Sequence, residues 1–299
     1  MASQNLPAPV AIPENLTQLP WYLPSIGTRL TDGFRALLSE YANIPEELQC
    51  EHIYQARDAA FQTFPLATIG EFWFLTLGLS EHPKYTLLVE RLKLASTIKR
   101  PILVDIGTCI GQDLRKLVYD GAIPEQFVGI DIFADFAEVG YSFFKDKTLM
   151  GNCFETADIF ETNEQDYLNR TLGSWDVVTS SLFLHAFDLA NQFKAITKMF
   201  KLVKGRGSCI LGLTGADLNG QDVPVLPPLV PEGVKKSRYV HSTETLTELF
   251  KAVSESLGLE VSIETGYQED VDSVYTQAIQ TSFFATSNAR ILFYFVEIL

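Results

Sequence analysis

Cysteine is scarce in this chain, and the few cysteines lie far apart. There are four among 299 residues: Cys50, Cys109, Cys153 and Cys209. They show neither the paired spacing of a zinc site nor the density of a disulfide scaffold. We therefore expect free, mostly buried thiols and no bound metal.

Long apolar runs and an excess of positive charge are also missing. No stretch approaches the roughly 18 consecutive apolar residues of a membrane span, and residues 1–20 lack the basic segment and apolar run of a secretory leader. With 23 basic against 37 acidic residues, the net charge of -14 repels polyphosphates. We therefore expect a cytoplasmic protein that binds neither nucleic acid nor a membrane.

The first third of the chain lacks any alternation of strands and helices. It opens with a proline-rich arm that contains Leu-Pro-Trp-Tyr-Leu-Pro at 19–24. Apolar residues then recur at helical spacing over 32–41, 45–61 and 85–96. We interpret residues 1–98 as an N-terminal arm followed by a helical cap or lid.

Residues 99–299 show a different sequence pattern, because short apolar runs alternate there with segments of helical periodicity. This alternation predicts an α/β fold with a Rossmann-like, doubly wound and mostly parallel sheet. Strands are expected at 102–106, 127–131, 149–154, 176–180 and 208–213, with helices between them at 112–119, 136–145 and 191–202.

The end of the chain departs from this alternation. A long polar and proline-rich loop at about 214–242 is expected on the substrate side of the sheet, followed by a helix at 243–257. Two further strands, near 261 and at 291–297, are expected to pair antiparallel. The predicted architecture is thus a mostly parallel sheet with an antiparallel C-terminal edge strand and an N-terminal helical extension.

A glycine turn follows the first expected strand. Asp105 lies near the end of that strand, and Gly107 and Gly111 allow the backbone to approach a ligand at the N-terminus of the next helix. Asp131 ends the second strand, where a carboxylate can accept hydrogen bonds from both hydroxyls of a ribose, and Ile132 follows it. A glycine turn alone is common, but its combination with this acid indicates an adenosine-containing ligand.

Polar residues also follow the third and fourth expected strands. Asp158 is placed to accept a hydrogen bond from an adenine amino group, with the backbone of Ile159 completing recognition of the base. Ser180 opens the loop after the fourth strand. Because the carboxyl ends of parallel strands meet at one edge of a sheet, we expect these residues to line the same cofactor site.

The spacing of the glycine turn separates two kinds of adenosine ligand. Dinucleotide dehydrogenases use G-x-G-x-x-G, whereas Cys109 and Gln112 stand here at the second and third glycine positions, so close approach of a pyrophosphate is not provided for. S-adenosylmethionine carries no phosphate. Tyr141 and Lys145 mimic a dehydrogenase Tyr-x-x-x-Lys pair but lie too early in the fold, so S-adenosylmethionine is the expected cofactor.

Several strings in the sequence resemble one family. They are Ile-Gly-Glu-Phe-Trp-Phe-Leu at 69–75, Leu-Gly-Leu at 77–79, Gly-Gln-Asp-Leu-Arg-Lys-Leu-Val at 111–118 and Asp-Gly-Ala at 120–122. On these strings the chain resembles class I S-adenosylmethionine methyltransferases, and among them the small fungal enzymes of meroterpenoid pathways of the austinoid, andrastin and terretonin type. The resemblance covers most of the chain. It implies O-methylation of a small-molecule secondary metabolite, often at a carboxylic acid of a terpenoid or polyketide-derived scaffold.

The acceptor side of the site is less sharply defined. Methyl transfer is an in-line displacement, so positioning and the exclusion of water can supply most of the catalysis. A carboxylate acceptor needs no base, whereas a phenol or an alcohol benefits from one. His185 is the best-placed candidate base, with a packing role as the alternative, and Tyr22, Trp73 and His185 are the residues expected to contact the substrate.

Three other interpretations stay open at this point. The chain could bind S-adenosylmethionine and catalyse a cyclisation or rearrangement without methyl transfer, act as a nicotinamide-dependent dehydrogenase, or be a non-catalytic partner with a vestigial site. The sequence also leaves open the identity of the acceptor, whether the protein is a homodimer, and whether the arm closes its own pocket or a neighbour's.

Overall fold

The computed structural model describes residues 15–299 except 96, 98, 99, 226–228, 231, 269–273 and 284. The first part of the expected arm and the expected domain boundary at 98 and 99 therefore lie outside the described residues. Among the helices that are described, none has the length and apolarity needed to cross a membrane.

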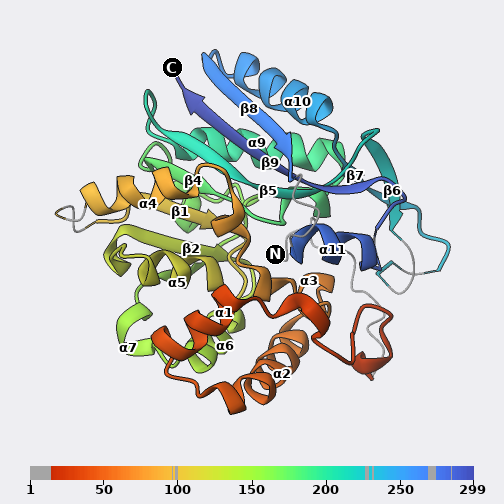
Figure 1. Cartoon of the computed structure of the whole chain (residues 1–299). Coiled ribbons are helices and arrows are strands. Elements are labelled where there is room, and N and C mark those ends of the chain that lie inside the picture. Colours follow the sequence, from red (N-terminus) through yellow and green to blue (C-terminus); the bar gives the residue numbers. More distant parts are fainter. Residues whose placement is uncertain are drawn as a thin grey trace.

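Seven strands form one sheet in the order β3-β2-β1-β4-β5-β9-β8 (Figure 1). Strands β1 to β5 are parallel to one another, and β9 is antiparallel to both of its neighbours, β5 and β8. The predicted Rossmann-like architecture is thus confirmed, with the antiparallel strand placed second from the edge. The strands are β1 (Leu103–Ile106), β2 (Phe127–Asp131), β3 (Phe154–Thr156), β4 (Val177–Thr179), β5 (Cys209–Asp217), β8 (Val261–Tyr267) and β9 (Ala289–Ile298).

Helices cover both faces of this sheet, which explains why its strands read as continuous apolar runs. Alternate residues of a strand serve the two faces: Val104 packs in the cluster under α9 and α10, and Leu103 in the cluster under α4 and α5. The helices are α4 (Tyr85–Leu94), α5 (Gln112–Tyr119), α6 (Asp135–Phe144), α9 (Leu189–Leu202) and α10 (Thr243–Ser256).

The N-terminal region is helical, as predicted, and packs against α6 through a third apolar cluster that includes Phe34, Phe61 and Phe143. The Thr31 hydroxyl starts its first helix by accepting a hydrogen bond from the N–H of Phe34 at 3.1 Å. The region comprises α1 (Asp32–Ala36), a π-helical turn at Leu37–Tyr41, α2 (Glu46–Thr63) and α3 (Ala67–Gly70). Of these, α1 and α2 lie beside α6 in Figure 1.

A buried ion pair ties this region to the sheet. Arg115 of α5 donates through Nε and Nη2 to the two carboxylate oxygens of Asp146, at 2.7 and 2.9 Å. Tyr41 of the N-terminal region donates its hydroxyl to the same carboxylate at 2.7 Å. Because Arg115 is fully buried, removing one partner would leave a charge without compensation and destabilise the fold.

Two segments differ from the sequence-based expectation. The third strand is β3, which begins only at Phe154, because Leu149 and Met150 belong to the helical turn α7 (Lys147–Met150), whose Met150 is buried. The expected loop at 214–242 is partly ordered: β5 extends through Asp217, and β6 (Gln221–Val225) pairs antiparallel with β7 (Lys236–Val240). The helix α11 (Val274–Thr281) has no counterpart in the sequence-based prediction.

Candidate active site

The turn after β1 has the conformation that its glycines allow. Gly107 and Gly111 have φ values of 76° and 72°, which a residue with a side chain adopts only with strain. Cys109 lies between them and carries that strain, with φ at 52°. Asp105 is buried at the start of the turn and accepts a hydrogen bond from the hydroxyl of Thr179 at 2.8 Å.

The two glycines have different surroundings. A Cβ on Gly107 would lie 2.6 Å from the Phe183 ring, at the carboxyl end of the sheet. A Cβ on Gly111 would instead lie 2.4 Å from the ring of Phe154 and 2.6 Å from Nη1 of Arg115, within the protein. Gly107 therefore faces the loop that follows β4. Gly111 permits α5 to pack closely on β3.

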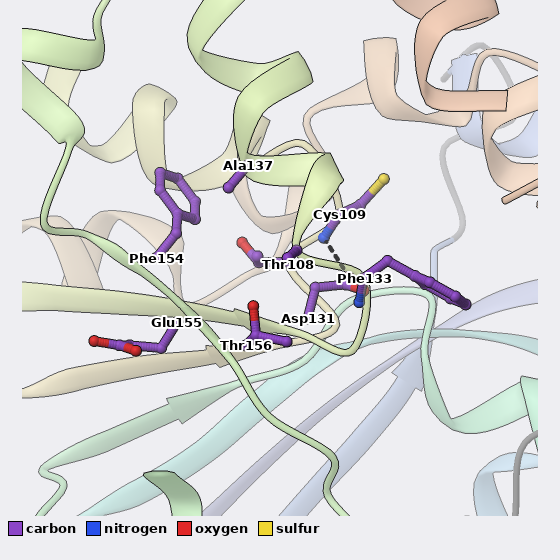
Figure 2. A pocket seen from close by; sticks show the side chains of 9 residues that line it. Thr108, Cys109, Asp131, Phe133, Ala137, Phe154, Glu155 and Thr156 are labelled. Carbon is purple, nitrogen blue, oxygen red and sulfur yellow. Dashed lines mark hydrogen bonds between the residues drawn. The ribbon is translucent and has the colours of Figure 1, made fainter. Parts of the chain in front are cut away.

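Asp131 closes the turn from the neighbouring strand. Its carboxylate accepts hydrogen bonds from the N–H of Cys109 at 2.9 Å and of Phe133 at 3.1 Å. Burial raises the pKa of this carboxyl, and the backbone donors oppose that shift. Figure 2 shows the Asp131 side chain beside Thr108 and Cys109, at a small pocket between the glycine turn, α6 and β3.

A backbone hydrogen bond holds the loop that carries Asp158 and Ile159 beside this pocket. The N–H of Ala157 donates to the carbonyl of Asp131 at 3.1 Å, which holds the loop after β3 against the end of β2. The carboxylate of Asp158 accepts from the N–H of Phe160 at 2.9 Å, and the side chain of Ile159 is buried in the core. Ile132, which follows Asp131, is partly exposed.

Ser180 has a different environment. Its side chain is buried, and its hydroxyl donates to the carbonyl of Ile106 at 3.2 Å. Its own carbonyl accepts from the hydroxyl of Tyr294 at 2.7 Å. These bonds join β4 to β1 and β9. The next residue, Ser181, has a buried hydroxyl oxygen without a hydrogen-bond partner among the described residues.

The residues around the glycine turn fit an adenosyl group bearing a cationic sulfonium. Asp131 supplies an anionic acceptor, and Ser181 Oγ and Gln112 Oε1 are buried polar atoms with no partner in the described part of the chain. The cavity beside Asp131 measures about 30 Å³ in this conformation, against roughly 300 Å³ or more for pockets that enclose small molecules. A ligand of that size therefore extends beyond this cavity.

His185 lies over the carboxyl end of β5. Its Nδ1 accepts a hydrogen bond from the N–H of Gly215 at 3.3 Å, and a Cβ on Gly215 would lie 3.2 Å from the imidazole Cγ. Burial, together with the charge of Arg238, lowers the pKa of His185 to about 3. A neutral imidazole whose Nδ1 accepts must carry its proton on Nε2, so His185 presents a donor, not a base.

Trp73 and Tyr22 lie in separate clusters. Trp73 packs with Leu213 of β5, and its Nε1 donates to the carboxylate of the buried Glu71 at 2.8 Å. Tyr22 belongs to the N-terminal cluster, and its hydroxyl donates to Asp58 of α2 at 2.7 Å. Trp73 thus lies near β5 of the sheet. The hydroxyl of Tyr22 instead points to α2 of the N-terminal region.

Sequence reasoning did not single out Arg238, Phe183, Glu71 or Asp113. Arg238 fell within a segment that was expected to be a loop, where a cation is usually a solvated surface group. Asp113 is buried in the first turn of α5 and accepts from the N–H of Leu79 at 3.2 Å. Its position directly after the glycine turn was the one signal that could have drawn attention to it.

Comparison with known proteins agrees with this geometry. A family model described as the N-terminal domain of meroterpenoid methyltransferases matches residues 21–75. The O-methyltransferase phiE of a fungal species is 31% identical over 252 residues, which cover 84% of this chain and 80% of phiE.

Two further relatives give the same result. The O-methyltransferase atr3 of Stereocaulon alpinum is 32% identical over 253 residues, covering 84% of this chain and 70% of atr3. The asnovolin E/chermesin D methyltransferase nvfJ of Aspergillus novofumigatus is 31% identical over 245 residues, covering 81% and 83%. The chain therefore belongs to the family of fungal meroterpenoid-type methyltransferases and is an S-adenosylmethionine-dependent O-methyltransferase of secondary metabolism.

Proposed function

We propose that this enzyme methylates a carboxylate oxygen of a terpenoid or polyketide-derived acid. The observation that carries the proposal is the hydrogen bond from the N–H of Gly215 to Nδ1 of His185. It leaves Nε2 as a donor, so His185 cannot remove a proton from a phenol or an alcohol. A carboxylic acid is already ionised near neutral pH and needs no base.

The cofactor is proposed to lie along the carboxyl ends of β1, β2 and β3. Asp131 would accept hydrogen bonds from the ribose hydroxyls, and Gly107 would let the turn approach the ligand closely. Asp158 and Ile159 would bind the adenine, which is supported by the backbone bond that holds their loop beside Asp131. When bound, S-adenosylmethionine supplies an electrophilic methyl group on a sulfonium.

The remaining residues would act by position and by exclusion of water. The ring of Phe183 lies against Gly107 and forms an edge-on contact with Phe187 at 5.0 Å between ring centroids. Trp73 adds an apolar wall near the end of β5. An anionic acceptor and a cationic donor react with loss of charge, so a dry, apolar enclosure of this kind favours the reaction.

The mass and chemistry of the product test this proposal. The enzyme is incubated with S-adenosylmethionine bearing a deuterated methyl group and with a panel of terpenoid and aromatic polyketide acids. We expect a product heavier by one labelled methyl group that mild alkali hydrolyses back to the acid. A labelled product that resists alkali would identify an ether and overturn carboxyl methylation, and an unlabelled isomer would support cyclisation without methyl transfer.

A variant separates a donor role of His185 from a basic one. His185→Gln retains a hydrogen-bond donor but has no titratable nitrogen. Carboxyl methylation predicts that this variant keeps a large part of kcat, whereas a histidine base would make it nearly inactive, by about 100-fold or more. Retention of S-adenosylhomocysteine binding in the variant shows that the fold is intact.

Three broader features also stay proposals. We propose that residues up to about 98 act as a cap on the acceptor side, supported by the contact of Trp73 with Leu213. A cytoplasmic location and a homodimer are further proposals, which fractionation and light scattering of the purified protein would test.

A further inference from the structure

The ribbon formed by β6 and β7 lies across the loop that contains His185. The N–H of Tyr239 in β7 donates to the carbonyl of Phe187 at 2.9 Å, and the N–H of Asp217 at the end of β5 donates to the carbonyl of His241 at 2.9 Å. The ribbon is therefore fixed at two points, at the loop that follows His185 and at the end of β5.

Arg238 lies on the inner face of this ribbon. Side chains alternate along a strand, so Arg238 shares a face with Val240, which is 3% exposed, and it pairs across the ribbon with Val223. The neighbouring Ser237 belongs to the other face, where its hydroxyl donates to Asp222 at 3.1 Å. Arg238 is itself partly buried, although it carries a full positive charge.

The guanidinium of Arg238 acts on His185. Its positive charge contributes to the low pKa of His185, and burial lowers the pKa of Arg238 itself. The Nε2 of His185 has no hydrogen-bond partner among the described residues. The backbone bond from Tyr239, which follows Arg238, to Phe187, two residues after His185, brings the two segments together. A cationic fork and a neutral N–H donor therefore lie near each other, at the end of the sheet where the acceptor is expected.

We propose that Arg238 and the Nε2–H of His185 together bind the carboxylate of the acceptor, so that Arg238 determines the preference for acids. This inference rests on the proposed carboxyl methylation and names the residues that recognise its substrate. A guanidinium presents five N–H donors in a planar fork that matches the two oxygens of a carboxylate. A neutral phenol, alcohol or ester offers neither the negative charge nor the two equivalent acceptor oxygens of a carboxylate to this fork and is discriminated against.

The binding experiment uses the full chain saturated with S-adenosylhomocysteine. Farnesoic acid, 2,4-dihydroxybenzoic acid and decanoic acid are titrated by calorimetry, each alongside its methyl ester. The variants are Arg238→Gln, Arg238→Lys and, as a matched control, Lys236→Gln, which removes the same charge from an exposed position on the same strand and face.

We expect the wild-type protein to bind at least one acid more tightly than its ester. Arg238→Gln should weaken binding of that acid about 10- to 100-fold while leaving the ester unchanged, because hydrogen bonds to charged groups are lost. Arg238→Lys should recover part of the loss, and Lys236→Gln should match the wild type. The affinity for S-adenosylhomocysteine, measured in every variant, reports that the site is folded.

Two results would overturn the inference. One is a wild-type protein that binds none of the acids more tightly than the matching ester. The other is an acid preference that persists in Arg238→Gln. Failure of the proposed function is distinguishable, because it consists of a product that is not a methyl ester. An enzyme that forms methyl esters with equal efficiency in Arg238→Gln would refute only the role of Arg238.

Discussion

The proposed cofactor half of the site, at the ends of β1 to β3, contains the buried carboxyls of Asp105 and Asp113 and the partly exposed Asp131. The proposed acceptor half, between β5 and β7, contains the neutral His185 and the cationic Arg238. The two halves therefore have opposite polarity. A sulfonium is a cation and a carboxylate is an anion, so each half is complementary to one reactant. Under the proposed function, this arrangement separates the two binding sites by charge before either ligand arrives.

The largest expected effect tests the cofactor half. Asp131→Ala removes an anionic acceptor of ribose hydrogen bonds and should weaken S-adenosylhomocysteine binding by on the order of 2 to 4 kcal/mol. Calorimetry measures this, with Glu155→Ala as the matched control, since Glu155 lines the same pocket from an exposed position. Unchanged affinity in Asp131→Ala would remove this carboxylate from the cofactor site.

The next effect tests the close approach at the glycine turn. In Gly107→Ala the new methyl group meets the ring of Phe183 at 2.6 Å and the residue keeps φ near 76°, which should cost about 1 to 3 kcal/mol of unfolding free energy in urea.

Two further variants separate the backbone strain of Gly107→Ala from its contact with the Phe183 ring. Gly173→Ala is the control, because Gly173 has φ at 68° and open space around it, so it reports backbone strain alone. Adding Phe183→Ala to Gly107→Ala should remove the contact and leave only the strain. An equal loss in Gly107→Ala and Gly173→Ala would mean that Phe183 does not cover the turn.

A smaller effect concerns pH. Burial raises the pKa of Asp105 to about 6 and, with help from the charge of Asp105, that of Asp113 to about 7. A bound cation favours the ionised carboxyls, so S-adenosylmethionine binding should release protons and weaken several-fold as the pH falls through these values.

The uncharged thioether of S-adenosylhomocysteine provides the internal control and should show a weaker dependence. Asp113→Asn should remove part of the effect. On the acceptor half, burial lowers the pKa of His185 to about 3, so the pH profile of kcat/KM for the acid, measured at saturating S-adenosylmethionine, should show no inflection from this histidine near 6.5. Calorimetry in buffers of different ionisation enthalpy measures the protons, and identical release for both ligands would contradict the electrostatic difference between the halves.

The smallest effect concerns Tyr22. The hydroxyl of Tyr22 bonds to Asp58, whose side chain is 53% exposed, so Tyr22→Phe should cost less than about 1 kcal/mol of stability and leave the KM for the acid unchanged. Thermal unfolding and steady-state kinetics measure the two quantities. A raised KM with unchanged stability would instead place Tyr22 in the acceptor half, as the sequence analysis expected.

The sequence revealed the cofactor half better than the acceptor half, for a physical reason. Asp131 and Gly107 follow buried strands directly, so local hydrophobic patterning predicts their positions at one edge of the sheet. The state of His185 depends on the N–H of Gly215, thirty residues later, and the position of Arg238 depends on the pairing of β6 with β7. Such long-range pairing leaves little trace in a local pattern.

The misplaced third strand has a similar explanation. Leu149 and Met150 are apolar enough to suggest a strand, yet they end the helical turn α7, and β3 consists of three residues that pair with β2 from Gly129 to Asp131. Periodicity cannot separate so short a strand from the turn before it. The pairing of Asp131 with Thr156 nevertheless brings the loop of Asp158 to the expected edge.

The position of β9 also has a consequence for synthesis of the chain. Residues 289–297 pair with β5 along its whole length, from Cys209 to Asp217, and among the described residues β8 joins the sheet only through β9. On the ribosome, β5 therefore emerges long before its partner and presents an unpaired apolar edge to other nascent chains. Slow elongation or the absence of chaperones during recombinant expression should consequently lower the yield of this enzyme through aggregation, even where the completed fold is stable.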